Sequence, residues 1–352
     1  MTVLMTTDTV GGTWTYALEL VNALASRGVE VVLAAIGRPS RDQLDEVASS
    51  RLAGFHAADY RLEWMEDPWD DVDEAGEWLL ELADELEPTL VHLNGYAHVA
   101  LPWKAPAVVV GHSDVLSWHE AVRGAPAGEE WSRYRSLVEA GLAAADLLVA
   151  PTRALLDALV RLYEPSCPRL VVPNGVSSAA AARSKREVVL AAGRVWDEAK
   201  NLQALVRIAP RLSWPVAIAG EGDPGPGVER PGRLPRQELA ERLAEAAVFA
   251  APAFYEPFGL AALEAGCAGC ALVLGDIPTL REVWDDAALF VPPADDEALV
   301  EALGRMIDDR RLREDYAARA RRKACGYTAG RMASGYAMVY ERAVAREGVR
   351  SG

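Results

Sequence analysis

The stretch FYEPFGLAALEAG at residues 254–266 lies between two short apolar segments, residues 248–251 and 271–274, which have the length and composition of buried strands. Its first half carries Pro and Gly and predicts a loop, whereas its second half predicts a helix. The order strand, loop, helix, strand is the repeating unit of a parallel α/β sheet. We therefore expect Glu256 in a loop at the carboxyl end of a strand and Glu264 about two turns into the next helix.

The start of this helix has the properties of an anion site. The backbone N–H groups of Phe258, Gly259 and Leu260 have no partner inside a helix, and the helix dipole adds partial positive charge there. A phosphate or a sugar oxygen suits this place, and the carboxylates of Glu256 and Glu264 can accept hydrogen bonds from neutral hydroxyls. The alternative is that the acidic residues only stabilise the helix.

Apolar and amphipathic segments alternate in two successive series, which predicts an α/β protein of two domains with parallel sheets. The expected strands are residues 3–5, 29–35, 90–93, 108–110, 147–150 and 170–172 in the first series, and residues 188–192, 216–219, 248–251, 271–274 and 289–291 in the second. The pattern also predicts helices at residues 72–86 and 330–346 and a linker at residues 176–185. Open parallel sheets bind ligands at the carboxyl ends of their strands, so the site is expected there.

The chain has 352 residues, enough for two domains, and a formal net charge of −16. This charge repels nucleic acid and anionic lipid headgroups, so neither nucleic-acid binding nor stable membrane binding is expected. No export signal and no apolar run of ~20 residues is visible, which predicts a cytoplasmic protein. Cys267 and Cys270 form a lone C-x-x-C without the second ligand pair of a zinc site, so we expect reduced thiols and no metal.

Arg194 and Lys200 in AAGRVWDEAKN follow the predicted strand at residues 188–192, and only four of the 36 basic residues are lysines. Two cations at the carboxyl end of one strand have a natural partner in a diphosphate, which an Arg binds bidentately and a Lys attracts as a point charge. The alternative is a surface ion pair with Asp197 or Glu198.

Glycines and polar side chains also follow strands of the first series. Gly11 and Gly12 come between the first strand and a helix, where they either let the backbone approach an anion or make a tight turn. The G-x-G-x-x-G fingerprint is missing, which argues against NAD binding. His112 in VVVGHSD lies just past another strand and is a candidate for a catalytic role, although a structural role is equally open.

Residues near these strand ends are candidates for binding an acceptor substrate. They are His92 and Asn94 in VHLNGY, Asp114 after His112, and Trp14, whose ring can stack on an acceptor. Asp71 and Asp73 form an Asp-x-Asp, a spacing that chelates a divalent metal in some sugar transferases. Here they immediately precede the helix predicted at residues 72–86, so N-capping is the better interpretation.

Taken together, the Gly-Gly loop and the motifs GHSD, PNGV, GRVWDEAKN, AGEGDP and YEPFGLAALEAG make the chain resemble a family 4 glycosyltransferase of the GT-B fold. The match runs in order over nearly the whole length. The resemblance implies two facing Rossmann-like domains with parallel sheets. Residues 1–175 would bind the acceptor and residues 186–330 the nucleotide sugar, and a C-terminal helix in residues 331–352 would cross back to the first domain.

The resemblance also assigns roles to site residues. Arg194 and Lys200 would hold the donor diphosphate, Glu264 the ribose, and Glu256 the hydroxyls of the transferred sugar, while His112 would sit near the reacting carbon. The implied catalytic residues are thus His112, Glu256, Arg194 and Lys200, and the implied donor-binding residues are Gly11, Gly12, Arg194, Lys200, Leu234, Glu256, Phe258, Gly259, Leu260 and Glu264. Leu234 falls where such enzymes hold the base through backbone contacts.

The implied activity is a retaining, metal-independent transfer of a hexose-type sugar from a nucleotide diphosphate donor, with a UDP-sugar favoured, to a hydroxyl of a soluble small-molecule or saccharide acceptor. No cofactor is implied beside the nucleotide sugar. Two alternatives remain open at this point: a nucleotide-sugar epimerase or hydrolase on the same fold, and a nucleotide-binding protein without transferase activity. The sequence does not specify the donor, the acceptor, the pathway or the oligomeric state.

Overall fold

The computed structural model describes residues 1–177 and 183–350, with side chains up to residue 346 in the last helix. The chain divides into two compact units. The first contains residues 1–120, 125–177 and the segment from Ala329 onward, and the second contains residues 121–124 and 183–328 of the described part. Residues 178–182 of the predicted linker lie outside the described residues.

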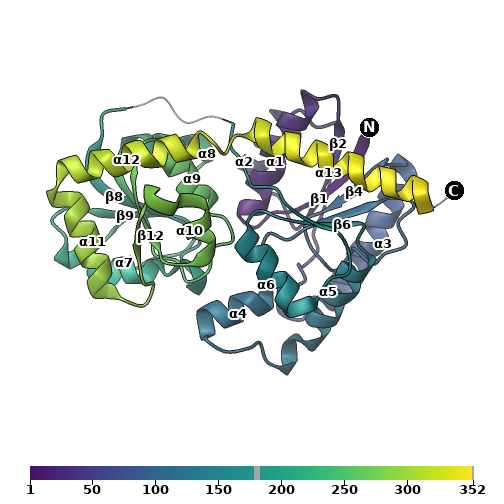
Figure 1. Cartoon of the computed structure of the whole chain (residues 1–352), viewed down its shortest axis with the longest axis horizontal. Helices are drawn as coiled ribbons and strands as arrows, with labels where there is room; N and C mark the ends of the chain where they lie inside the picture. Colours follow the sequence, from purple (N-terminus) through teal and green to yellow (C-terminus); the bar gives the residue numbers. More distant parts are fainter. Residues whose placement is uncertain (178–182, 351–352) are drawn as a thin grey trace. The chain divides into compact units, whose positions relative to one another are not determined.

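The first unit contains a seven-stranded sheet in which every pair of neighbours is parallel (Figure 1). Its strand order is β3-β2-β1-β4-β5-β6-β7. The strands are β1 (Thr2–Asp8), β2 (Glu30–Ile36), β3 (Gly54–Ala58), β4 (Leu90–Leu93), β5 (Ala107–Val110), β6 (Leu147–Ala150) and β7 (Arg169–Val171). The order reverses direction between β1 and β4, which is the switch point where doubly wound sheets bind their ligands.

The helices of this unit include the last helix of the chain (Figure 1). They are α1 (Gly12–Ala25), α2 (Arg41–Ala48), α3 (Trp69–Leu86), α4 (Val115–Arg123), α5 (Ser132–Ala144), α6 (Arg153–Tyr163) and α13 (Ala329–Arg350). α13 contacts α1, β4 and β5, and Arg27 near the end of α1 donates to the carbonyl of Gly330 at 2.8 Å and to Oγ of Ser334 at 2.6 Å. The predicted return of the C-terminal helix to the first domain is confirmed.

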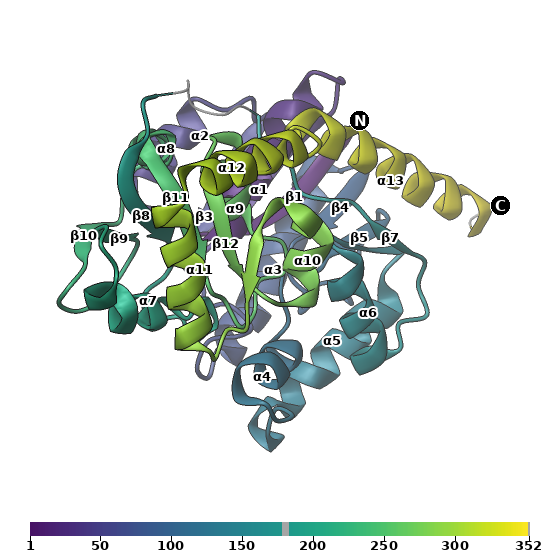
Figure 2. The same ribbon diagram turned by 60° about the vertical axis from the view of Figure 1, so that its left-hand side comes forward.

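The second unit contains a six-stranded parallel sheet of order β10-β9-β8-β11-β12-β13. Its strands are β8 (Arg186–Ala192), β9 (Val216–Ala219), β10 (Glu229–Gly232), β11 (Ala246–Ala251), β12 (Ala271–Gly275) and β13 (Leu289–Val291). Its helices are α7 (Leu202–Ile208), α8 (Arg236–Glu245), α9 (Leu260–Cys267), α10 (Pro278–Trp284), α11 (Asp296–Asp308) and α12 (Arg310–Ala324). α7 packs with α11, while α12 packs with α9 and β12 (Figure 2).

Two strands and one helix start differ from the sequence-based expectation. β3 (GFHAA) and β10 (ERPG) are edge strands with half-exposed or exposed residues, so neither shows the apolar run by which the other strands are recognised. α3 begins at Trp69, so Asp71 and Asp73 lie inside the helix and the N-capping interpretation is wrong. Asp71 instead pairs with Arg61 at 2.5 Å, and Asp73 with Arg133 at 3.3 Å.

Two backbone segments come very close together at the carboxyl edge of the second sheet. Gly220, directly after β9, has a φ of +152°, and a Cβ built on it would lie 1.7 Å from the carbonyl oxygen of Gly193 after β8. Only glycine fits there, because the neighbouring atom belongs to the backbone and cannot rotate away.

Gly220→Ala is therefore expected to lower the free energy of unfolding by ~2 kcal/mol more than Gly225→Ala, measured by urea unfolding. Gly225 is a matched control, because its φ is also positive, +100°, but a Cβ on it meets no atom within 4 Å. Equal losses in the two variants would show that the approach to Gly193 is not a packing constraint.

Candidate active site

The loops that follow β8, β9 and β10 meet at the carboxyl edge of the second sheet. Gly193 donates its N–H to the carbonyl of Ala219 at 3.0 Å, and Gly220 donates to the carbonyl of Gly232 at 2.9 Å. These bonds extend the hydrogen bonding between neighbouring strands by one residue, and they hold the starts of the three loops side by side. Leu234, the predicted contact of the base, follows β10 and is partly exposed at this edge.

Arg194 follows Gly193 and is held by its own loop. Its Nη2 lies 2.6 Å from Oδ2 of Asp197, and the guanidinium stacks 5.1 Å from the ring centroid of Trp196. Asp197 is buried and also accepts the N–H of Ala199 at 3.0 Å. The ion pair with Asp197 that the sequence offered as an alternative is thus present, and it fixes the guanidinium at the end of β8.

Lys200 and Glu256 form an ion pair that joins the loop after β8 to the loop after β11. The Nζ of Lys200 lies 2.7 Å from Oε2 of Glu256, and the two side chains are only 23% and 22% exposed. The other carboxylate oxygen of Glu256 accepts the N–H of Gly259, the N-cap residue of α9, at 3.0 Å. The structure therefore brings Lys200, Glu256 and the start of α9 together.

The same contact corrects one expectation. The N–H of Gly259 was predicted to be open for a ligand, but the carboxylate of Glu256 accepts it. Gly259 has a φ of +89°, a left-handed conformation that glycine adopts without strain and that turns the loop into α9. Phe258 is buried against Tyr327, whereas Leu260 and Glu264, one turn apart on α9, are partly exposed.

In the first unit, His112 and Asn94 meet at the carboxyl ends of β5 and β4. The Nε2 of His112 lies 2.8 Å from Oδ1 of Asn94, and the imidazole packs edge-on against Tyr16 with ring centroids 4.3 Å apart. Gly11 is the N-cap residue of α1 and has a φ of +99°, and Gly12 is the first residue of that helix. The predicted Gly-Gly turn between β1 and α1 is therefore present.

Two histidines at this edge are neutral near pH 7. Burial lowers the pKa of His92 to about 4. Burial and, to a lesser extent, the neighbouring charge of His92 lower the pKa of His112 to about 3. A histidine with so low a pKa is a poor proton donor to a leaving group at neutral pH, but its ring nitrogens remain good hydrogen-bonding groups.

Comparison with known proteins shows the family to which this chain belongs. Residues 10–179 match the family described as Glycosyltransferase Family 4, and residues 177–323 match the family described as Glycosyl transferases group 1. The D-inositol 3-phosphate glycosyltransferase of Kineococcus radiotolerans is 31% identical over 298 residues, which cover 69% of this chain and 67% of that protein. The chain belongs to the family 4 glycosyltransferases.

This glycosyltransferase also resembles relatives and structures of greater coverage. The glycogen synthase of Mycobacterium tuberculosis is 27% identical over 364 residues, covering 89% of this chain and 86% of that protein. The structure of a sucrose-phosphate synthase from Thermosynechococcus elongatus superposes with a TM-score of 0.81 over 98% of this chain and 100% of that one, at 17% identity. The fold is GT-B, and the enzyme transfers a sugar from a nucleotide donor to an acceptor.

Three of the four residues predicted to bind the acceptor are instead buried in the glycosyltransferase. Trp14 donates its indole N–H to Glu46 at 2.7 Å and packs edge-on against Phe55. Asp114 is 2% exposed and accepts from the hydroxyls of two tyrosines and the N–H of Ser117, and His92 is fully buried. None of the three presents a surface to a substrate, and only Asn94 of the set is partly exposed.

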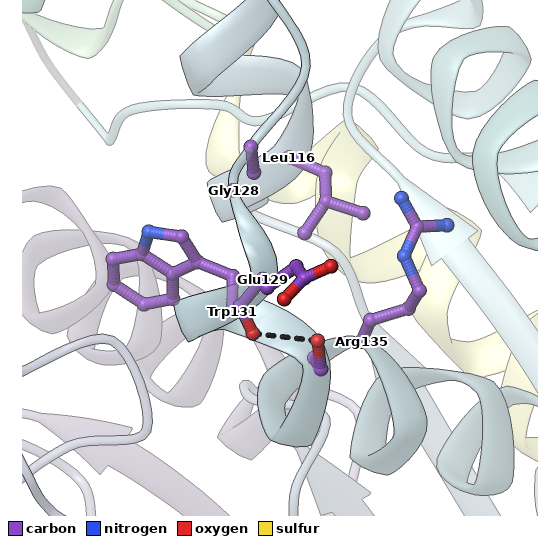
Figure 3. A pocket seen from close by; sticks show the side chains of 7 residues that line it. Leu116, Gly128, Glu129, Trp131 and Arg135 are labelled. Atoms are coloured by element: carbon purple, nitrogen blue, oxygen red, sulfur yellow. Dashed lines mark hydrogen bonds between the residues drawn. The ribbon is translucent and has the colours of Figure 1, made fainter.

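A cavity of about 220 Å³ lies away from the predicted residues, between α4 and the start of α5 (Figure 3). Leu116, Trp131 and Arg135 line it, and the hydroxyl of Ser132 donates to the carbonyl of Glu129 at 2.5 Å at its wall.

None of the described helices is long and apolar enough to cross a bilayer. Within the described residues, no three His, Cys, Asp or Glu side chains form a group able to hold a metal ion.

The neutral histidines predict how the stability of the glycosyltransferase depends on pH. The unfolded chain takes up a proton on each ring below its ordinary pKa of about 6.5, whereas the folded chain does so only near pH 4 at His92 and pH 3 at His112. The stabilisation is therefore complete above about pH 6.5 and is lost as the pH falls towards the folded values, at ~1.4 kcal/mol per pH unit for each ring.

His112→Gln is expected to make the free energy of unfolding fall less steeply between about pH 6 and pH 4, by ~1.4 kcal/mol per pH unit, in urea titrations at each pH. The wild-type chain is the reference, so protonation of carboxylates cancels in the comparison. The same slope in both proteins would mean that His112 is not held neutral by the fold.

Proposed function

We propose that this glycosyltransferase transfers a hexose-type sugar from a UDP-sugar, with retention of configuration and without a metal ion, to a hydroxyl of a soluble small-molecule or saccharide acceptor. The observation that carries the proposal is the joining of Lys200, Glu256 and the start of α9 at the carboxyl edge of the second sheet. A cation beside a helix N-terminus suits a diphosphate, and a carboxylate in the same place suits sugar hydroxyls.

The proposed sugar transfer requires the site to stabilise a leaving diphosphate. As the bond between the sugar carbon and the diphosphate oxygen breaks, negative charge grows on that oxygen, and Lys200, Arg194 and the amides of Phe258 and Leu260 would stabilise it. The acceptor oxygen would bond to the same face of the sugar, and its proton would pass to the leaving phosphate. The cations supply the charge that a metal ion supplies in other transferases.

The remaining residues keep their proposed roles as contacts. Glu256 would accept hydrogen bonds from the transferred sugar and Glu264 from the ribose, while Leu234 would face the base. Gly11 and Gly12 would let the backbone come close to the diphosphate. We also propose the division of labour in which residues 186–330 bind the nucleotide sugar and residues 1–175 bind the acceptor.

The nature of the acceptor is inferred from relatives and from charge. Relatives are named for D-inositol 3-phosphate and for glycogen, a small polar molecule and a saccharide. A net charge of −16 disfavours docking on anionic lipid, because enzymes that dock in this way carry basic amphipathic surfaces. These two considerations support a water-soluble acceptor, and we propose that the enzyme is cytoplasmic.

The donor proposal is tested by thermal shift with UDP, GDP, dTDP and ADP in buffer that contains EDTA. UDP is expected to raise the melting temperature most, because a ligand that binds only the folded state stabilises it in proportion to RT ln(1 + [L]/Kd). A larger shift with another nucleotide would overturn the UDP assignment, and a UDP shift that appears only when divalent metal is added would overturn the metal-independent mechanism.

Lys200→Ala is expected to lower the turnover number by ~100-fold, the scale of losing one preorganised group that stabilises a developing anion. Lys104→Ala is the matched control, because Lys104 pairs with Asp84 on the exposed surface and should leave turnover unchanged. Transfer is measured as UDP release that depends on the acceptor. Unchanged turnover in Lys200→Ala would remove this lysine from the mechanism, and UDP release without any acceptor would favour a donor hydrolase.

A further inference from the structure

A chain of hydrogen bonds runs from His112 into the core of the first unit. Both His112 and His92 direct Nε2 at the same oxygen, Oδ1 of Asn94, at 2.8 and 3.0 Å. On its other side, His92 places Nδ1 2.7 Å from the hydroxyl of Tyr340 on α13. Tyr340 and His92 are fully buried, whereas Asn94 and His112, at the other end of this series of hydrogen bonds, are partly exposed.

The direction of these bonds is fixed by a backbone carbonyl. The amide nitrogen of the Asn94 side chain lies 2.6 Å from the carbonyl oxygen of Thr6 on β1, and the Asn94 N–H donates to Oγ1 of Thr6 at 2.9 Å. A carbonyl can only accept, so the Asn94 NH₂ must face Thr6. The opposite orientation would set two carbonyl oxygens 2.6 Å apart, and it is excluded. Oδ1 of Asn94 therefore faces both imidazoles.

An acceptor oxygen between two neutral imidazoles requires an N–H from each. His92 and His112 are both neutral near pH 7, so each ring carries one proton. That proton lies on Nε2 in both rings, which leaves Nδ1 of His92 to accept from the hydroxyl of Tyr340. The Tyr16 hydroxyl also lies 3.4 Å from Nε2 of His92. It cannot donate to this nitrogen, because an unprotonated Nε2 would then face Oδ1 of Asn94, and both atoms are acceptors.

We propose that Asn94, anchored on Thr6 and supported by the buried pair His92 and Tyr340, is a positioning residue that fixes the tautomer of His112. His112 then carries its proton on Nε2 and presents Nδ1 as a hydrogen-bond acceptor. The proposal rests on the proposed function, in which the ring of His112 lies by the transferred sugar, and it gives that ring a definite task. Nδ1 accepts a hydrogen bond from a substrate hydroxyl and neither donates nor transfers a proton.

This arrangement gives α13 a part in the site. His92 and Tyr340 are 248 residues apart in the sequence, and their hydrogen bond links the last helix of the chain to the strand end that carries Asn94. Strand β4 alternates its side chains, so Val91 and Leu93 pack in the core cluster with α5 and α6 residues while His92 turns to α13. Asn94 is thereby held from two sides, by β1 and by α13.

The tautomer is measured directly by long-range ¹H–¹⁵N NMR of the full-length chain labelled with [¹⁵N]histidine, in which protonated and bare ring nitrogens give separate signals. His112→Gln assigns the His112 signals. In the wild-type chain, Nε2 of His112 is expected to be protonated and Nδ1 bare. In Asn94→Leu, which removes the acceptor at nearly the same volume, His112 is expected to populate both tautomers. Tyr336→Phe, on the same face of α13 but outside the chain of hydrogen bonds, should leave the His112 signals unchanged.

A kinetic readout accompanies the spectrum. Asn94→Leu is expected to lower the turnover number by ~10-fold, the scale of losing a group that orients a site residue, while the thermal shift by UDP stays as in the wild type. Tyr336→Phe serves as the control for turnover as well.

If Asn94 has only a structural role, Asn94→Leu lowers stability but leaves the tautomer of His112 unchanged. A wild-type His112 protonated on Nδ1, or an unchanged single tautomer in Asn94→Leu, would overturn the inference. Absence of transfer by the wild type with any donor would instead overturn the proposed function, and the spectrum would still decide the tautomer.

Discussion

The ion pair between Lys200 and Glu256 joins the two loops that carry the proposed donor site. Each residue follows a different strand, and the strands are neighbours in a parallel sheet, so their carboxyl ends open at the same edge. Both side chains are nearly four-fifths covered, and a charge in such surroundings is costly without its partner. Glu256 also accepts the N–H of Gly259, the N-cap residue of α9, so the pair lies directly at the start of that helix.

The candidate site residues of the two units differ in their electrostatics. In the second unit, Arg194 pairs with Asp197 and Lys200 pairs with Glu256, so each cation has a carboxylate partner. A diphosphate can share these cations, since its charge-assisted hydrogen bonds are stronger than neutral ones. In the first unit, Asn94 and the two neutral histidines are oriented by hydrogen bonds that start from the carbonyl of Thr6. The group in the second unit can respond to a charged ligand, and the group in the first unit keeps a fixed pattern of donors and acceptors.

Sequence patterns predicted those parts of the molecule that follow from local periodicity. Strands β4, β6 and β9 have the predicted bounds because each is a short apolar run that is fully buried. The edge strand β13 is partly exposed but still apolar, whereas the polar edge strands β3 and β10 have no such signal. Strand-end reasoning also predicted that Lys200 and Glu256 would each lie at the carboxyl end of a strand, but not that they would form an ion pair. It could not predict that His92 and Trp14 would be buried, nor that Tyr340 would bond to His92, because those contacts depend on how distant segments pack. Gly259 shows the same limit: its position was predicted, but not that Glu256 would occupy its N–H.

The central claim is that a nucleotide diphosphate binds where Lys200, Glu256 and the start of α9 come together. A crystal structure of the chain grown with UDP tests it most directly. The account predicts diphosphate oxygens within hydrogen-bond distance of the Nζ of Lys200 and of an amide at the start of α9, with the ribose hydroxyls at Glu264. A diphosphate bound at another place, with the contact between Lys200 and Glu256 unchanged and no nucleotide atom near α9, would contradict it.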